Sequence, residues 1–162
     1  GYMHVNSEPG RGTSFSIYFP TVAEQAERIS ETAPDKHLEG DEKILFVDDE
    51  EAIVDITKKQ LCRIGYTVEA RTDPVEALKL FEENPDKFDL VISDMTMPNM
   101  SGVALAEKLR QTRPEIPIII CTGHSSLVNE ERANTVGISA YATKPVSKVK
   151  LAKIIRDVLN KR

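Results

Sequence analysis

The sequence contains little that would cross-link a protein or anchor it in a membrane. It has two cysteines, Cys62 and Cys121, which belong to no CxxC pair and have no other metal-ligand spacing. We therefore expect ordinary buried thiols of a reducing compartment. No apolar run approaches the roughly 20 residues that a membrane-spanning helix needs, and no secretory signal pattern is present. These absences predict a cytoplasmic protein without membrane contact of its own, and they leave open a membrane-anchored parent chain.

A surplus of basic residues is also lacking. The formal net charge is −5, and residues 21–42 account for all of it, because they hold seven acids against Arg28 and Lys36. This acidic stretch is poor in large apolar residues, which is typical of a linker. It divides the chain into residues 1–20, a linker at 21–42 and a compact body at 43–162. An acidic linker and a neutral body predict no nucleic-acid binding.

Beyond residue 43, short apolar runs alternate with amphipathic stretches of helical length. Three runs are apolar without alternation, as expected for strands that are covered on both faces. Strands separated by helices predict an α/β fold, a doubly wound parallel sheet with right-handed crossovers. The five runs are KILFV (43–47), YTVEA (66–70), DLVIS (89–93), PIIIC (117–121) and ISAYA (138–142).

Helix signals lie between and after these runs. Asp73 is expected to cap a helix that begins at Pro74, since proline is favoured in the first helical turn. A further helix is expected after Ser101, and the last from about Ser147. The last helix has a basic stripe, which is more typical of a solvated helix face than of a binding surface; it consists of Lys148, Lys150, Lys153 and Arg156.

Polar side chains stand where the predicted strands end, and ligands of such sheets bind there. The first strand ends in Asp48 and Asp49, the third in Asp94, the fourth in Thr122, and the fifth runs into Lys144. Two carboxylates about 4 Å apart repel by roughly 4 kcal/mol at an effective dielectric of about 20, so adjacent acids require a cation. Three acids in a small volume suit Mg²⁺, which prefers oxygen ligands. The sequence therefore predicts a magnesium site at this edge.

Four motifs on these strand ends, FVDDE, ISDMTMPNMSG, CTG and YATKP, together resemble the phospho-acceptor receiver domain of two-component response regulators. The resemblance covers residues 43–162. It implies a flavodoxin-like fold with five strands in the order 2-1-3-4-5, and it implies that Asp94 is phosphorylated. It also implies that Asp48, Asp49 and Asp94 hold magnesium together with the backbone carbonyl of Thr96. The implied phosphate donor or acceptor is a histidine kinase or a histidine phosphotransfer protein.

The same resemblance implies roles for further residues. Lys144 offers a positive charge to the phosphoryl group, and Thr122 can donate a hydrogen bond to one of its oxygens. Tyr141, three residues before Lys144, is expected to be the aromatic switch residue, with simple packing at the sheet edge as the alternative. Thr96 and His124 are expected to tune the lifetime of the phosphate. In this interpretation the chain assists its own phosphorylation and dephosphorylation but is not an independent enzyme.

Two other functions use a similar fold. A phosphatase or phosphotransferase of the haloacid-dehalogenase type also has a strand-end aspartate and magnesium, but it needs an acid two residues after the nucleophile, where Thr96 stands here. A flavodoxin-like flavin carrier would need a phosphate-binding loop after the first strand. That loop is acidic in this sequence and would repel a phosphate.

Residues 1–20 form a separate pattern. Apolar side chains alternate at Phe15, Ile17 and Phe19 after a Pro-Gly turn, which predicts a β-hairpin. The segment SEPGRGTSFSIYFP resembles the closing hairpin of the histidine-kinase ATP-binding domain. This resemblance implies that the chain is the C-terminal part of a hybrid sensor histidine kinase. The alternative is an unrelated N-terminal extension.

Overall fold

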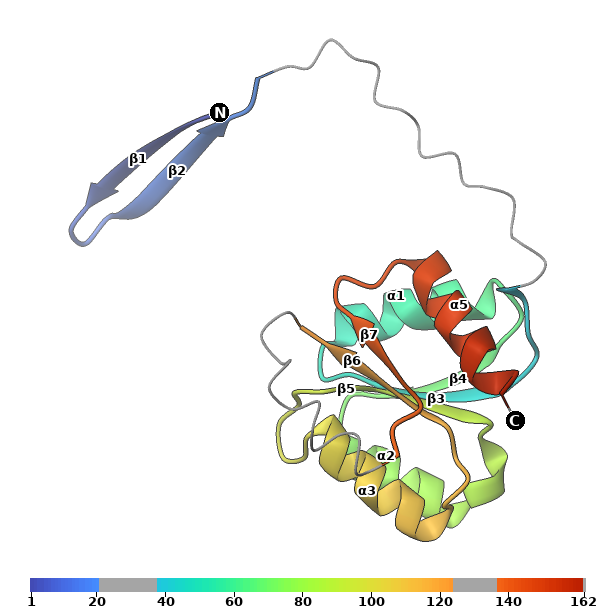
Figure 1. Ribbon diagram of the computed structural model, residues 1–162. Coiled ribbons are helices and arrows are strands. Elements are labelled where there is room, and N and C mark those ends of the chain that lie inside the picture. The colour runs from blue at the N-terminus through green and yellow to red at the C-terminus, as the bar shows by residue number, and fades with distance from the viewer. Residues whose placement is uncertain (21–37, 124–136, 162) are drawn as a thin grey trace. The chain divides into compact units, whose positions relative to one another are not determined.

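A computed structural model describes residues 1–20, 38–123 and 137–161. The chain divides into two compact units, Gly1–Thr32 and Ala33–Arg162. Each unit has its own β-sheet (Figure 1). None of the helices in the described ranges has both the length and the apolar character needed to cross a bilayer.

The first unit contains an antiparallel hairpin, as the alternation of its sequence predicts. Strands β1 (Tyr2–Glu8) and β2 (Gly12–Tyr18) pair along their whole length. Gly10 and Gly12 in the turn have φ angles of 79° and 94°, a left-handed conformation that glycine adopts without strain. The turn therefore depends on glycine at these two positions.

One face of this hairpin is apolar and is not covered by residues 1–20 themselves. Met3 stands opposite Ile17 and Val5 opposite Phe15, so these four side chains share one face of the ribbon. All four are exposed, Phe15 to 63% of its surface. An isolated two-stranded hairpin is marginally stable in water, and this one buries almost no side chain of its own.

The second unit is built on a parallel sheet in the order β4-β3-β5-β6-β7. Numbered within this unit, the order is 2-1-3-4-5, which confirms the predicted flavodoxin-like topology. The central strands β3, β5 and β6 are buried along almost their whole length, which explains why their sequences do not alternate. The strands are β3 (Lys43–Val47), β4 (Thr67–Arg71), β5 (Leu90–Asp94), β6 (Ile118–Thr122) and β7 (Ala140–Thr143).

Helices cover both faces of the sheet (Figure 1), so the described core consists of two apolar clusters, one on each side. Helices α1 and α5 pack on one side, and α2 and α3 on the other. The helices are α1 (Glu51–Cys62), α2 (Pro74–Glu83), α3 (Gly102–Thr112) and α5 (Lys148–Leu159), with a short 3-10 helix at Pro85–Lys87.

The helix starts follow the predicted caps. The side chain of Asp73 accepts a hydrogen bond from the backbone N–H of Val75 at 2.7 Å, and Pro74 is the first residue of α2. Ser101 and Ser147 cap α3 and α5 in the same way. Local side-chain hydrogen bonds therefore set three of the helix boundaries.

Some predicted details differ in the structure. β4, β5 and β6 each begin and end one residue later than the apolar runs, so that Asp94 and Thr122 are the last residues of their strands. Asp89, predicted as the first residue of the third strand, lies just before β5. Its carboxylate accepts a hydrogen bond from the backbone N–H of Lys43, the first residue of β3. Cys62 is exposed at the end of α1, so the expectation of a buried thiol was wrong for this residue and right for Cys121.

Candidate functional site

Two buried carboxylates lie at the carboxyl edge of the sheet. Asp48 follows β3 and is 1% exposed, and Asp94 ends β5 and is 7% exposed. Asp48 Oδ1 accepts a hydrogen bond from the backbone N–H of Glu50 at 3.1 Å, and Asp94 Oδ2 accepts one from Thr96 N–H at 2.8 Å. Each carboxylate is thus oriented by the backbone two residues further along the chain.

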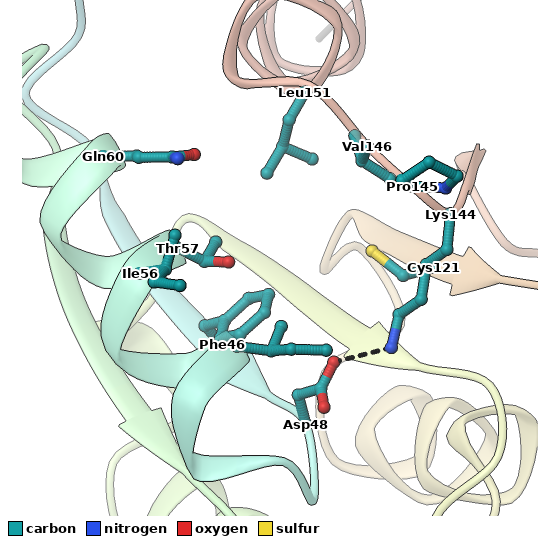
Figure 2. Close-up of a pocket in the computed structure, with 11 residues that line it drawn as sticks. Phe46, Asp48, Ile56, Thr57, Gln60, Cys121, Lys144, Pro145, Val146 and Leu151 are labelled. Carbon is teal, nitrogen blue, oxygen red and sulfur yellow. Dashed lines mark hydrogen bonds and ion pairs between the residues drawn. The ribbon is translucent and has the colours of Figure 1, made fainter. Parts of the chain in front are cut away.

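The ammonium group of Lys144 contacts both acids. Its Nζ lies 2.8 Å from Asp48 Oδ2, as drawn in Figure 2, and 2.5 Å from Asp94 Oδ1. Burial on its own would lower the pKa of Lys144, but hydrogen bonds to the two carboxylates outweigh it and raise the pKa above the ordinary value. The lysine therefore stays charged at neutral pH and compensates charge on Asp48 and Asp94, not on the adjacent pair Asp48 and Asp49 for which the sequence predicted a cation.

Asp49 takes no part in this contact. It is exposed, whereas Asp48 beside it is buried. Within the ranges that the structure describes, no three acidic, histidine or cysteine side chains converge as a metal cage would require. The Lys144 ammonium contacts both Asp48 and Asp94 and compensates part of their charge.

Thr122 lies beside this cluster at the end of β6 and is 7% exposed. Its hydroxyl donates to the carbonyl oxygen of Gly123 at 3.1 Å, and its own carbonyl oxygen accepts from the backbone N–H of Lys144 at 2.7 Å. The strand ends that carry the hydroxyl and the ammonium are therefore tied together. The predicted constellation of Asp48, Asp94, Thr122 and Lys144 is assembled at one edge.

Gly102, the first residue of α3, is a site residue that sequence reasoning missed. A Cβ atom at this position would overlap the carbonyl oxygen of Asp94 and lie 3.0 Å from Ser93 Oγ. The backbone N–H of Gly102 donates to the carbonyl oxygen of Met95 at 3.0 Å. Glycine lets α3 begin directly against the end of β5, and this close approach fixes the loop that follows Asp94.

Three further residues, Thr96, His124 and Tyr141, were predicted to act in switching or in phosphate lifetime. Tyr141 in β7 pairs with Ile120 and is half-buried against the core cluster that contains α2 and α3. Thr96 is exposed next to Asp94. His124 lies outside the described residues. The roles of all three in switching or phosphate lifetime stay predictions.

A pocket of about 480 Å³ adjoins Asp48, between α1 and the segment that joins β7 to α5 (Figure 2). Asp48 and Lys144 line it together with apolar side chains such as Phe46 and Ile56. The Cys121 thiol also lines it, and burial raises its pKa to about 12. This thiol is therefore neutral at physiological pH and a poor nucleophile.

Comparison with known proteins places this fold in a family. The model of the response regulator receiver domain matches residues 44–156. The chain belongs to this family, which confirms the resemblance of its body to the receivers of two-component phosphorelay proteins. Nothing in the comparisons supports the haloacid-dehalogenase alternative.

Individual relatives include sensor kinases. The chain is 32% identical to the sensor kinase CckA of Brucella abortus (strain 2308), in an alignment that takes in 100% of this chain and 18% of that protein. It is also 32% identical to the sensor protein EvgS of Escherichia coli (strain K12), over 91% of this chain and 12% of that protein. The chain thus spans less than a fifth of either relative.

Solved structures agree with the fold. A response regulator receiver domain from Clostridium thermocellum is 35% identical, with a TM-score of 0.71, over 74% of this chain and 95% of that one. A CheY-like receiver domain from Methanospirillum hungatei JF-1 is 37% identical, with a TM-score of 0.69, over 75% of this chain and 96% of that one.

Proposed function

We propose that the receiver unit accepts a phosphoryl group on the carboxylate of Asp94 from a phosphohistidine of a histidine kinase or a phosphotransfer protein. The observation that carries this proposal is the contact of one ammonium, Lys144 Nζ, with both Asp48 and Asp94 at the carboxyl edge of the sheet. A carboxylate that contacts an ammonium group at the carboxyl edge of a parallel sheet is suited to act as a covalent acceptor.

In the transfer step an Asp94 carboxylate oxygen attacks phosphorus, a P–O bond forms, and the P–N bond to histidine breaks with its electron pair left on the imidazole nitrogen. The oxygens of the transferred phosphoryl group bring negative charge close to Asp48. Lys144 neutralises part of this charge by moving from Asp48 to a phosphoryl oxygen. The Thr122 hydroxyl, which now donates to the carbonyl of Gly123, turns to donate to another. The N–H of Thr96 continues to orient the acceptor carboxyl.

Receiver domains generally depend on magnesium, and we propose that the oxygen donors at this edge hold that ion once Lys144 has released Asp48. The carboxylates of Asp48, Asp49 and Asp94 and the carbonyl oxygen of Thr96 are oxygen ligands of the kind that Mg²⁺ prefers. The bound ion would neutralise charge on the transferring phosphoryl group. Because Lys144 holds Asp48 in the structure, we propose that it must release this carboxylate when magnesium binds.

The experiment that tests this function is incubation of the chain with acetyl phosphate and magnesium, followed by measurement of the intact mass. We expect the wild type to gain one phosphoryl group and Asp94→Asn to gain none. Asp157→Asn, which changes an exposed aspartate in α5, is the matched control and should behave as wild type. Phosphorylation of Asp94→Asn would overturn the assignment.

We further propose that Thr122 and Tyr141 form the conformational switch. Moving a two-state equilibrium from 1:99 to 99:1 takes about 5.5 kcal/mol, whereas a charge-assisted hydrogen bond contributes roughly 1.5 to 3 kcal/mol. Thr122 therefore shares the work with Lys144. Thr122→Ala should keep phosphorylation of Asp94 largely intact and weaken the response around Tyr141. Equal amide shifts of Tyr141 on beryllofluoride binding in wild type and Thr122→Ala would contradict this.

We also propose that residues 1–20 are the closing hairpin of a kinase ATP-binding domain, and that this receiver serves a hybrid sensor histidine kinase. Two observations support this: the alignment with CckA takes in the whole chain, and the hairpin leaves an apolar face exposed. Without the body of that domain, we expect the chain not to bind ATP. Micromolar binding of magnesium-ATP in calorimetry would contradict this assignment.

A further inference from the structure

Residues 38–42, here called the linker anchor, are built into the receiver unit although their composition resembles that of the acidic linker. Leu38 packs against the core cluster that contains α1 and α5. The backbone N–H of Gly40 donates to the carbonyl oxygen of Ile64 at 3.1 Å. The carbonyl oxygen of Glu42 accepts a hydrogen bond from the first residue of β4 at 3.1 Å. The anchor therefore has both apolar and backbone contacts with the receiver.

The last helix holds this anchor through a charged side chain. Arg156 of α5 forms an ion pair with Glu42, and its guanidinium carbon lies 5.2 Å from the centre of the Tyr66 ring. The hydroxyl of Tyr66 in turn donates to the carbonyl oxygen of Leu38 at 3.4 Å. Only 17% of the Arg156 side chain and 24% of the Glu42 side chain are exposed. This ion pair is shielded from water more than an ordinary surface pair.

Two glycines make this packing possible. A Cβ atom on Gly40 would lie 2.5 Å from Tyr66 Cε1 and 2.9 Å from an Arg156 terminal nitrogen. A Cβ atom on Gly65, whose φ is 99°, would overlap the carbonyl oxygen of Gly40. The two backbones approach each other closely only because neither residue has a side chain. The contact between the linker anchor and the receiver therefore requires glycine at both positions.

α5 connects the anchor to the phosphorylation site. The helix begins at Lys148, four residues after Lys144, and Arg156 lies eight residues further along it. At 1.5 Å per residue this is about 12 Å of helix. A helix moves as a rigid body over such a length, so a displacement of its first turn reaches Arg156. Figure 1 shows the described residues directly before β3 beside α5, in agreement with the ion pair of Glu42 with Arg156.

We propose that the linker anchor couples the state of the phosphorylation site to the linker through α5. When Lys144 leaves Asp48 for the phosphoryl group, α5 shifts, and the contacts of Arg156 with Glu42 and Tyr66 readjust. The position of residues 38–42, through which the chain enters the receiver, then differs between the two states. This inference rests on the proposed function, and the coupling is reciprocal, so a change at the anchor also changes the affinity of the site for a phosphoryl mimic.

Amide NMR of the full chain with magnesium and beryllofluoride tests the inference. In the wild type we expect shifts at Thr96, which report binding, and at Gly40 and Glu42, which report the anchor. Arg156→Met should keep the shift at Thr96 and lose those at Gly40 and Glu42. Lys153→Met is the matched control because it removes an exposed cation from the same helix, and it should behave as wild type.

The outcomes separate the two proposals. A shift at Thr96 with no shift at Gly40 and Glu42 in the wild type overturns the coupling and leaves the proposed function intact. Equal shifts of the anchor in wild type and Arg156→Met also overturn it. No shift at Thr96 in any variant overturns the proposed function and the coupling with it. If Arg156→Met does not fold, Glu42→Gln removes the same ion pair and has the same expected result.

Discussion

The hairpin unit and the receiver unit use apolar residues in opposite ways. In the receiver, side chains such as Phe81 and Ile92 are fully buried between helices and sheet. In the hairpin, Phe15 and Ile17 have 63% and 58% of their surface exposed. Burial of a large apolar side chain stabilises a fold by roughly 1.5 to 3 kcal/mol. The receiver can therefore fold on its own contacts, whereas the hairpin alternates correctly but its apolar face is not covered by the described residues 1–20 of its own unit.

The largest expected effect is a core truncation compared with a hairpin truncation. Phe81→Ala should lower the free energy of unfolding of the receiver by roughly 3 to 5 kcal/mol, because Phe81 is fully buried and its ring stacks on Phe88. Phe15→Ala should change it by less than about 0.5 kcal/mol. Urea unfolding followed by circular dichroism measures both. Equal losses would mean that the hairpin takes part in the receiver fold.

Next in size is a pair of glycine substitutions. Gly102→Ala should destabilise the receiver by about 3 kcal/mol, the upper end for overpacking, because the added methyl overlaps the Asp94 carbonyl oxygen. Gly10→Ala places alanine at a φ of 79° in open space, so only the hairpin should lose stability. The midpoint of receiver unfolding in urea distinguishes them. An unchanged midpoint for Gly102→Ala would contradict the close approach of α3 to β5.

A smaller effect is expected when each unit loses the cation of an ion pair. Lys144→Met leaves Asp48 and Asp94 uncompensated and should cost the receiver about 1.5 kcal/mol without magnesium. Magnesium should restore much of this loss, because it can take the place of the ammonium. Arg11→Met breaks an exposed pair with Glu8 in the hairpin and should have no measurable effect. Thermal unfolding with and without magnesium checks both, and a loss that magnesium does not reduce would contradict competition for Asp48.

The smallest expected effect is the pH dependence of the stability difference between wild type and Lys144→Met. The two carboxylates raise the pKa of Lys144 in the folded state, so its ion pairs contribute fully below the unfolded pKa of about 10.4. The contribution is lost as pH rises from there through the folded pKa. The stability gap between wild type and Lys144→Met should therefore be constant from neutral pH to about pH 10 and then shrink. A gap that grows with pH would contradict the ion pairing.

Much of the receiver was predictable because its signals are local. Uninterrupted apolar runs marked the buried strands, and a parallel sheet brings their carboxyl ends together. Asp48, Asp94, Thr122 and Lys144 could therefore be assigned to one edge before any contact was known. Capping residues such as Asp73 fixed helix starts for the same reason.

What the sequence did not reveal depends on contacts between distant segments. Arg156 was interpreted as part of a solvated basic stripe, yet it is mostly buried against Glu42 and Tyr66. No periodicity marks partners that lie 114 and 90 positions away along the chain. Likewise, nothing in the acid motif indicates that Lys144 takes the position between Asp48 and Asp94 and leaves Asp49 exposed.

The central claim is that Asp94, among three neighbouring acids, is the residue that becomes phosphorylated. Borohydride reduces an acyl phosphate of aspartate to homoserine, so the modified position can be read by peptide mass spectrometry after treatment with acetyl phosphate and magnesium. We expect homoserine at position 94 and unchanged aspartate at positions 48 and 49. Homoserine at either of those positions, or at none of the three in a protein whose intact mass shows phosphorylation, would contradict the account.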